Sequence, residues 1–233
     1  MKKAIKPSRR MALAEYVRAM KTSRPLAVGL ALVTGLAAAQ GRAGAAQGAC
    51  DRLHGHDLAS AQSVKLVERR TADGVDLAAC SQPRGRVRVI ASRLTGSIYT
   101  ETFRLRQVAG AFAAVTSSFD DQYASGETTS VVNLRSGTRR KIASLQHDAG
   151  QAAERDGKRV AAIYVTSGGR GAASVVDSRG GDVEIVAFGA HGTPQPIDHG
   201  TVADIPAESL TLARATLSWT HAGAVRTARL PKP

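Results

Sequence analysis

The sequence predicts an all-β protein of four repeated antiparallel sheet units, arranged like the blades of a propeller and preceded by a signal peptide. Three observations carry this prediction. Hairpins with glycine turns recur along the chain, the turn glycines have a nearly constant spacing, and the first 45 residues have the charge pattern of an export signal. A β-sandwich also spaces its strands regularly and is the alternative architecture.

The clearest hairpin surrounds the Ser136-Gly137 pair, which lies between two β-favouring runs. A tight hairpin turn needs a residue that accepts a positive φ, and glycine does so without steric cost. Similar hairpins surround Gly85, Gly180 and Gly223. The last three turn glycines follow one another at intervals of 43 residues, and the first lies 52 residues before Gly137. An interval of about 40 to 45 residues with several strands per unit is typical of propeller blades.

Residues 1–45 are predicted to be a signal peptide, for which Met20 offers an alternative start of translation. A basic beginning leads into an uncharged run of 15 residues from Pro25 to Ala39, followed by Ala-x-Ala cleavage motifs. This run is shorter than the ~20 residues that a membrane-spanning helix needs. The alternative is an uncleaved anchor helix. We therefore expect a secreted protein, or one on the exterior of the cell envelope, without a membrane partner after cleavage.

The remaining residues, 46–233, are expected to form a single all-β repeat domain, which is long enough to enclose a core. Its two cysteines, Cys50 and Cys80, are the only ones in the chain. An even pair of cysteines in an exported protein favours a disulfide. Lipid attachment at Cys50 is the competing role, but it would leave Cys80 unpaired, and Gln47 stands where the lipoprotein pattern has an aliphatic residue.

The formal net charge of the chain is +13, and most of the excess lies in the predicted signal peptide. The rest of the chain has 23 basic and 18 acidic residues, an excess that is mild and spread along the predicted strands. A nucleic-acid partner would require a clustered basic face. We therefore expect no nucleic-acid partner.

Two predicted loops are the best candidates for a binding surface, because loops on a rigid scaffold carry most recognition. The first covers residues 119–126, and the second, residues 194–200, contains two prolines that lack the ladder donor. The candidate binding residues are Asp120, Asp121 and Tyr123 in the first loop and Asp198 and His199 in the second.

The sequence offers no catalytic residues, and we expect no metal and no cofactor. Asp198, His199 and Ser218 have the residue types of a hydrolase triad, but Ser218 is placed within a strand beside Trp219 and not on a sharp turn. The neighbouring carboxylates of Asp120 and Asp121 would point apart on an extended chain, which disfavours calcium. The His54-Gly55-His56-Asp57 segment lacks a second ligand cluster and is expected to be a solvated loop.

The closing segment, residues 209–226, with its Ser218-Trp219 pair, resembles the last unit of uncharacterised secreted actinobacterial proteins with β-propeller-like repeats. The preference for Arg over Lys after residue 45, 19 to 4, agrees with this resemblance. It implies no activity and no site residues. The expected function is that of a secreted, non-catalytic binding or scaffold module for an unknown extracellular ligand or protein. The alternative is a secreted hydrolase with an unrecognised active site, so enzymatic activity stays open.

Overall fold

The computed structural model describes residues 50–61, 64–81, 85–96, 99–148, 156–177 and 179–232. The predicted signal peptide, residues 1–45, lies outside the described residues. The described chain consists of antiparallel β-strands and one 3-10 turn, η1 (Ala207–Ser209), which confirms the all-β prediction. Within these ranges, no helix has the length and apolar character needed to cross a membrane.

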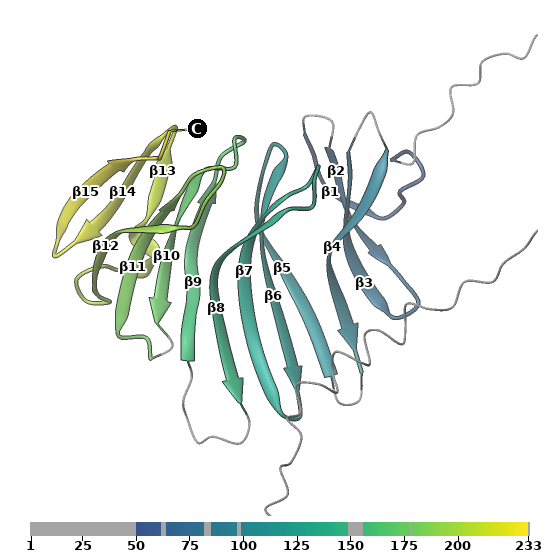
Figure 1. The fold of residues 1–233 in the computed structure, drawn as a ribbon, viewed down its shortest axis with the longest axis horizontal. Helices are drawn as coiled ribbons and strands as arrows, with labels where there is room; N and C mark the ends of the chain where they lie inside the picture. Colours follow the sequence, from purple (N-terminus) through teal and green to yellow (C-terminus); the bar gives the residue numbers. More distant parts are fainter. Residues whose placement is uncertain are drawn as a thin grey trace, which may run out of the picture. The chain divides into compact units, whose positions relative to one another are not determined.

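Twelve strands follow one another in chain order in one sheet, and three more form a second sheet (Figure 1). The strands of the first sheet are β1 (His56–Ala61), β2 (Val64–Arg70), β3 (Gly74–Ser81), β4 (Arg86–Thr95), β5 (Tyr99–Ala109), β6 (Phe112–Asp121), β7 (Ala124–Asn133), β8 (Arg139–Asp148), β9 (Asp156–Val165), β10 (Gly171–Asp177), β11 (Asp182–Phe188) and β12 (Gln195–Thr201). The second sheet comprises β13 (Thr211–Ala213), β14 (Thr216–His221) and β15 (Ala224–Arg229).

The pairing within the first sheet is uneven. The β5–β6 ladder extends from Tyr99–Asp121 to Ala109–Phe112. Among the described residues, only two residue pairs join β4 to β5, and only two join β8 to β9. We therefore divide the first sheet into three segments, β1–β4, β5–β8 and β9–β12, whose strands diverge at these two junctions.

Hydrophobic side chains join each segment to the next. The first cluster packs Leu66, Leu77 and Ile90 of β2–β4 against residues of β5–β7, and the second lies between β6–β8 and β9–β11. Along β6, Ala113 and Val115 belong to the first cluster and Ala114 to the second, so both faces of this strand are buried, as its apolar composition allows. Removal of one large side chain from such a cluster costs roughly 2–5 kcal/mol.

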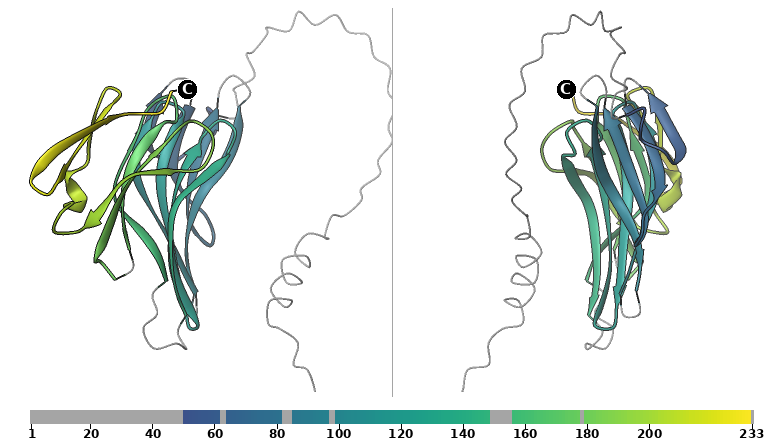
Figure 2. Two further views of the ribbon diagram at one scale, coloured as in Figure 1. Left: turned by 60° about the vertical axis from the view of Figure 1, so that its left-hand side comes forward. Right: turned by 90° about the vertical axis from the view of Figure 1, so that its right-hand side faces the viewer.

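A third cluster joins the segment β9–β12 to the C-terminal sheet. It packs Val183 and Ile185 of β11 against Leu217 and Trp219 of β14. Figures 1 and 2 show this sheet, in yellow, beside β10–β12, in green. The expectation that Trp219 is a core residue is confirmed, since the side chain is buried.

The disulfide between Cys50 and Cys80 is present, as predicted, with a Cα–Cα distance of 5.3 Å. It packs with Leu53, Val67 and Ala78. Val67 points away from its neighbour Leu66, which belongs to the first cluster. The bond therefore fixes the start of the described chain to the outer face of the first segment.

All four predicted turn glycines adopt positive φ values, from 59° at Gly85 to 79° at Gly137. Their spacing, however, does not mark equivalent positions. Gly137 follows the third strand of its segment, whereas Gly180 follows the second strand of the next segment, so the two turns lie at opposite ends of the sheet. The reason is that a meander needs tight turns at both of its ends.

The two predicted binding loops are shorter than expected. The chain turns only at Gln122–Tyr123, because Asp120 and Asp121 still belong to β6. Most of residues 194–200 forms β12, which corrects the loop prediction. Proline is tolerated there because β12 is the edge strand of the sheet and its register shifts opposite Ile185–Val186, next to Pro196.

Candidate functional site: an arginine-lined depression

The two ends of the first sheet differ in charge. Because the strands are antiparallel and in chain order, every connection from an odd-numbered to an even-numbered strand lies at one end. We call this end the arginine end, and it is uppermost in Figure 1. We include in it the β3–β4, β5–β6, β7–β8, β9–β10 and β11–β12 connections with three residues on either side of each, and these stretches contain no Asp or Glu. The β1–β2 connection lies at the same end, at the edge of the sheet, but is left out because Lys65 beside it pairs with Asp57 at 3.2 Å. The C-terminal residues belong to the same end, since Arg170 Nη1 donates to the Pro231 carbonyl at 3.0 Å.

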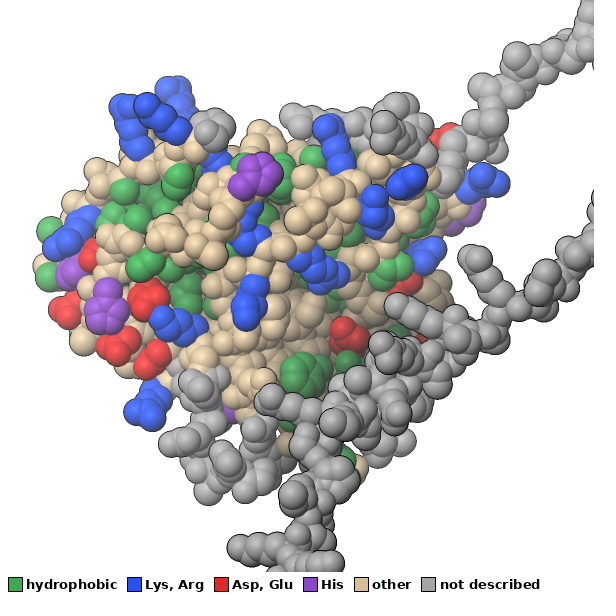
Figure 3. Space-filling model, viewed as in Figure 1, with side chains coloured by type: hydrophobic (Ala, Val, Ile, Leu, Met, Phe, Trp, Pro, Cys, Tyr) green, Lys and Arg blue, Asp and Glu red, His purple; other side chains and the backbone are tan. Residues whose placement is uncertain are grey.

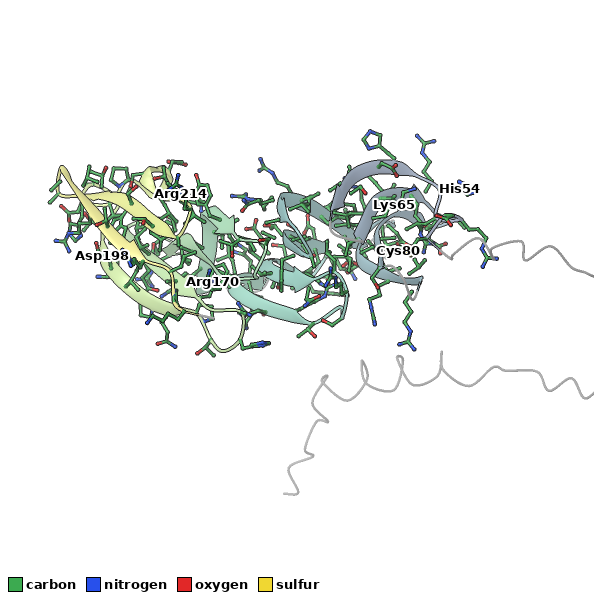
Figure 4. The ribbon with its side chains drawn as sticks, turned by 90° about the horizontal axis from the view of Figure 1, so that it is seen from above. His54, Lys65, Cys80, Arg170, Asp198 and Arg214 are labelled. Carbon is green, nitrogen blue, oxygen red and sulfur yellow. A yellow bond between two sulfur atoms is a disulfide. The ribbon has the colours of Figure 1, made fainter. Side chains whose placement is uncertain are left out.

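Basic side chains are frequent at the arginine end, so the interpretation that positive charge is spread along the strands needs correction. The basic residues of this end that the structure describes are Arg86, Arg88, Arg135, Arg139, Arg140, Lys141, Arg170, Arg214, Arg229 and Lys232. The opposite connections carry acidic residues, among them Asp73, Asp121, Asp177, Asp182 and Asp204. In Figure 3, most Lys and Arg side chains lie in the upper and middle parts of the visible face, whereas Asp and Glu are densest toward the lower left, where a few basic side chains accompany them. Figure 4, seen from above, places Arg170 and Arg214 beside the C-terminal strands.

A depression of about 690 Å³ opens at this end. Its wall comes from three connections and from the adjoining ends of β6, β7 and β8, and it includes Phe112, Asn133, Ser136, Thr138, Arg139, Arg140, Gly168 and His191. These side chains supply guanidinium, imidazole, amide and hydroxyl groups, and the lining contains no carboxylate. Such a set of hydrogen-bond donors suits an anionic ligand group.

Arg140 is held in a fixed position at the depression. Its Nη1 donates to the carbonyls of Gly169 and Gly189, and its Nη2 donates to the carbonyl of Ala190. Its Cζ lies 5.7 Å from the centroid of the Phe188 ring. Burial lowers the pKa of the Arg140 guanidinium, but the group stays protonated because the ordinary pKa of arginine is far above neutrality. The carbonyl dipoles orient the cation and leave its charge in place.

Neighbouring elements are tied together around the depression. Arg139 Nη2 donates to the carbonyl of Ile90, and Arg88 Nε donates to the carbonyl of Arg135 at 3.0 Å. The first bond joins β8 to β4, and the second joins β4 to the β7–β8 connection, so both link the first segment to the second. Since the guanidiniums bond backbone carbonyls, they join the segments without neutralising their charge.

Gly169 permits the close approach of the β9–β10 connection to the depression. Its φ is +75°, and a Cβ at this position would lie 2.5 Å from the Phe112 ring. Any side chain would therefore push the connection away from the ring that lines the depression.

Asp198, one of the sequence-predicted residues, has a different setting. Its Oδ2 accepts hydrogen bonds from Trp219 Nε1 at 2.6 Å and His221 Nδ1 at 2.8 Å, and its Oδ1 accepts one from the backbone N–H of His199 at 2.9 Å. Arg226 Nη1 lies 3.6 Å from Oδ1, and the Asp198 side chain is only 9% exposed. Desolvation by burial raises the pKa of Asp198, but the hydrogen bonds from His221, Trp219 and the His199 N–H outweigh it, and the pKa is lowered. Asp198 thus joins β12 to the C-terminal sheet.

The other predicted residues lie apart from Asp198 and from the depression. Asp121 Oδ1 accepts the backbone N–H groups of Tyr123 and Ala124, both at 2.7 Å, and so stabilises the β6–β7 turn. Asp120 and Tyr123 are exposed at the same turn, which belongs to the end opposite the depression. The His199 imidazole is exposed on β12.

Asp198, His199 and Ser218 do not form the hypothetical catalytic triad. The Asp198 carboxylate engages Trp219 and His221 instead of the His199 imidazole. The Ser218 hydroxyl lies 2.8 Å from the Thr211 hydroxyl on the neighbouring strand. Among the described residues, no group of three or more His, Cys, Asp or Glu side chains is placed to hold a metal ion.

A second depression, of about 620 Å³, is also lined by basic side chains, but two of its three arginines pair with acids. It lies at the opposite end and includes His54, His56, Glu68, Arg69 and Arg93 in its lining. Arg69 pairs with Asp76 at 3.0 Å, and Arg93 lies 3.7 Å from Glu68. The arginine end has no such pairing for Arg139 or Arg140 among the described residues.

No protein-family model and no curated protein matches this sequence. Among solved structures, the chain is similar to the β-propeller domain of Nup133 from Vanderwaltozyma polyspora, with 7% sequence identity and a TM-score of 0.28. The similarity covers 75% of this chain and 54% of that domain, so the chain spans about half the length of the domain it matches. At this level the likeness identifies neither a family nor a function.

Proposed function

We propose that this protein is an exported, non-catalytic binding module that holds an anionic ligand group in the depression at the arginine end. One observation carries the proposal: Arg139, Arg140 and His191 line a depression of about 690 Å³ that has no carboxylate in its wall. Guanidinium groups bind carboxylate, sulfate and phosphate through paired hydrogen bonds. The carbonyl acceptors that hold Arg140 orient this group before the ligand arrives, which reduces the ordering cost of binding.

The scaffold proposed for this module consists of four repeat units, namely the segments β1–β4, β5–β8 and β9–β12 and the sheet β13–β15. Two features support repeats of a propeller kind. Successive units share few ladder pairs, and hydrophobic clusters join them. Side-by-side packing of small antiparallel sheets is the principle of propeller architecture. Such units provide rigid support for the connections that line the depression.

Export is proposed from the predicted signal peptide, residues 1–45, and is supported by the Cys50–Cys80 disulfide. Disulfides persist mainly in oxidising compartments. The expected location is the outside of the cell or of its envelope.

A thermal-shift titration of the purified protein with citrate, sulfate and inorganic phosphate, with glucose as the neutral control, tests the binding proposal. At least one anion should raise the melting temperature in a saturable way. The double variant Thr138→Val/His191→Ala should weaken this response, because it removes two of the donors beside Arg139 and Arg140. The matched variant His54→Ala/His56→Ala, in the second depression, should retain it. No saturable response to any anion, or equal loss in both variants, would contradict the proposal.

A further inference from the structure

We propose that the whole arginine end binds a linear, soluble polyanion, namely a polysaccharide that carries carboxylate or sulfate groups. This inference rests on the proposed function and names the class of its ligand. The depression would hold one charged group of the polymer, and the basic side chains on either side of it would contact the neighbouring groups.

The basic surface continues beyond the depression in both directions. On one side, Arg88 of β4 reaches the Arg135 carbonyl at 3.0 Å. On the other, Arg170 reaches the Pro231 carbonyl at 3.0 Å, and Leu230 donates to the Ala215 carbonyl, next to Arg214, at 2.9 Å. Basic side chains thus follow one another from β4, across the depression, to the C-terminal residues. A small anion would use only the middle of this row, whereas a polymer with repeated charges matches its length.

The charges in this row are not compensated by neighbouring acids. Arg88, Arg139, Arg140 and Arg170 donate to backbone carbonyls, and no described carboxylate pairs with them. At the opposite end, basic groups do pair with acids, as in Lys158–Glu184 at 2.5 Å. Uncompensated charges of one sign together produce a field that attracts a polyanion. When the basic side chains contact the polymer, the counterions bound to the polymer are released.

The side chains at this end favour a polysaccharide over nucleic acid or a lipid surface. Single-stranded nucleic acids are held by exposed aromatic rings on which bases stack. The aromatic ring in the depression, Phe112, is half-buried against the backbone of Gly169. Membrane-surface binding requires a group of apolar side chains that insert into the lipid together. Two exposed large apolar side chains of this end, Val87 and Ile197, lie on strands of different segments, β4 and β12, and form no such group. The exposed residues Ser136 and Thr138 at the β7–β8 connection are instead hydroxyl-bearing, which suits sugar hydroxyls and acidic groups.

The test measures binding of the full protein to immobilised polygalacturonate, dextran sulfate and neutral dextran over a series of NaCl concentrations. At least one acidic polymer should bind, neutral dextran should not, and affinity should fall steeply with salt. If polygalacturonate alone binds, the recognised group is carboxylate, and if dextran sulfate alone binds, it is sulfate. Tighter binding of duplex DNA or of phosphatidylglycerol vesicles than of either acidic polymer would overturn the inference.

Two triple variants distinguish the effect of the arginine end on polymer binding from the effect of the protein's total charge. Arg86→Gln/Arg139→Gln/Arg214→Gln should weaken polymer binding by about tenfold or more. Arg70→Gln/Arg159→Gln/Arg179→Gln removes the same charge from exposed positions at the opposite end and should change binding much less. Melting temperatures confirm that both variants are folded. Equal weakening in the two variants would overturn the inference. Failure to bind either acidic polymer by a protein that still responds to small anions would overturn it too, and would leave the proposed function standing.

Discussion

Trp219 donates its indole N–H to the carboxylate of Asp198 across 2.6 Å, and this bond joins β14 to β12. Because Trp219 is buried, loss of the acceptor would leave its N–H without a partner, at a cost of about 1–3 kcal/mol. Asp198→Ala should therefore lower the melting temperature, by roughly 2–4 °C for each kcal/mol in a protein of this size. Asp182→Ala, at an exposed aspartate, is the control. Equal melting temperatures for the two variants would refute this structural role.

The same carboxylate should make stability depend on pH. The pKa of Asp198 is lower in the folded protein than its ordinary value, which is about 3.9 in an unfolded chain. Its contribution is therefore present in full above that unfolded value and is lost as the pH falls through the folded pKa. Chemical denaturation between pH 6 and 2.5 should show a steeper loss of stability for the native protein than for Asp198→Asn. Parallel curves would argue against an ionised Asp198 in the fold.

The disulfide should contribute measurably to stability. Cys50 and Cys80 are 30 residues apart, and closure of such a loop stabilises by about 3–4 kcal/mol in the chain-entropy model. Cys50→Ser/Cys80→Ser should lose about this much in urea denaturation. Addition of reductant should destabilise the native protein by a similar amount and leave the variant unchanged. A native protein indifferent to reductant would contradict the prediction.

Two glycines with nearly the same backbone conformation allow a matched test of the close contact at the depression. Gly169 and Gly180 have φ values of +75° and +73°, but a Cβ would meet Phe112 at the first and open space at the second. Gly180→Ala should cost only the strain of the left-handed conformation, about 1–2 kcal/mol. Gly169→Ala should cost more in urea denaturation, because the Phe112 ring must also move. Equal costs would show that the ring yields freely.

The sequence was sufficient to predict the all-β class, the disulfide and the positions of the main turns. These follow from local rules: alternating β-favouring residues, an even cysteine pair and glycine where φ must be positive. The 43-residue spacing of the turn glycines was harder to interpret, because glycine is needed in turns at both ends of the sheet. Gly137 and Gly180, which have this spacing, lie at opposite ends.

The candidate site was missed for a related reason. Asp198 was chosen for assumed exposure, yet its partners, Trp219 and His221, come from β14, more than 20 residues later in the chain, and bury it. The arginine end depends on which connections share an end of the sheet, and that is known only once the strand order is known. One signal was available in advance: residues 128–144 contain several bases and no acid, whereas acids flank this stretch.

Because basic residues are concentrated at the arginine end and acidic residues at the opposite end, this domain has an electric dipole moment along its strands. A molecule with such a moment turns in the field of a charged polymer before the two meet, so that productive collisions occur with the positive pole first. The orientation of capture would thus be decided at a distance of about a Debye length, ~8 Å at physiological ionic strength, and a dilute medium would extend that reach.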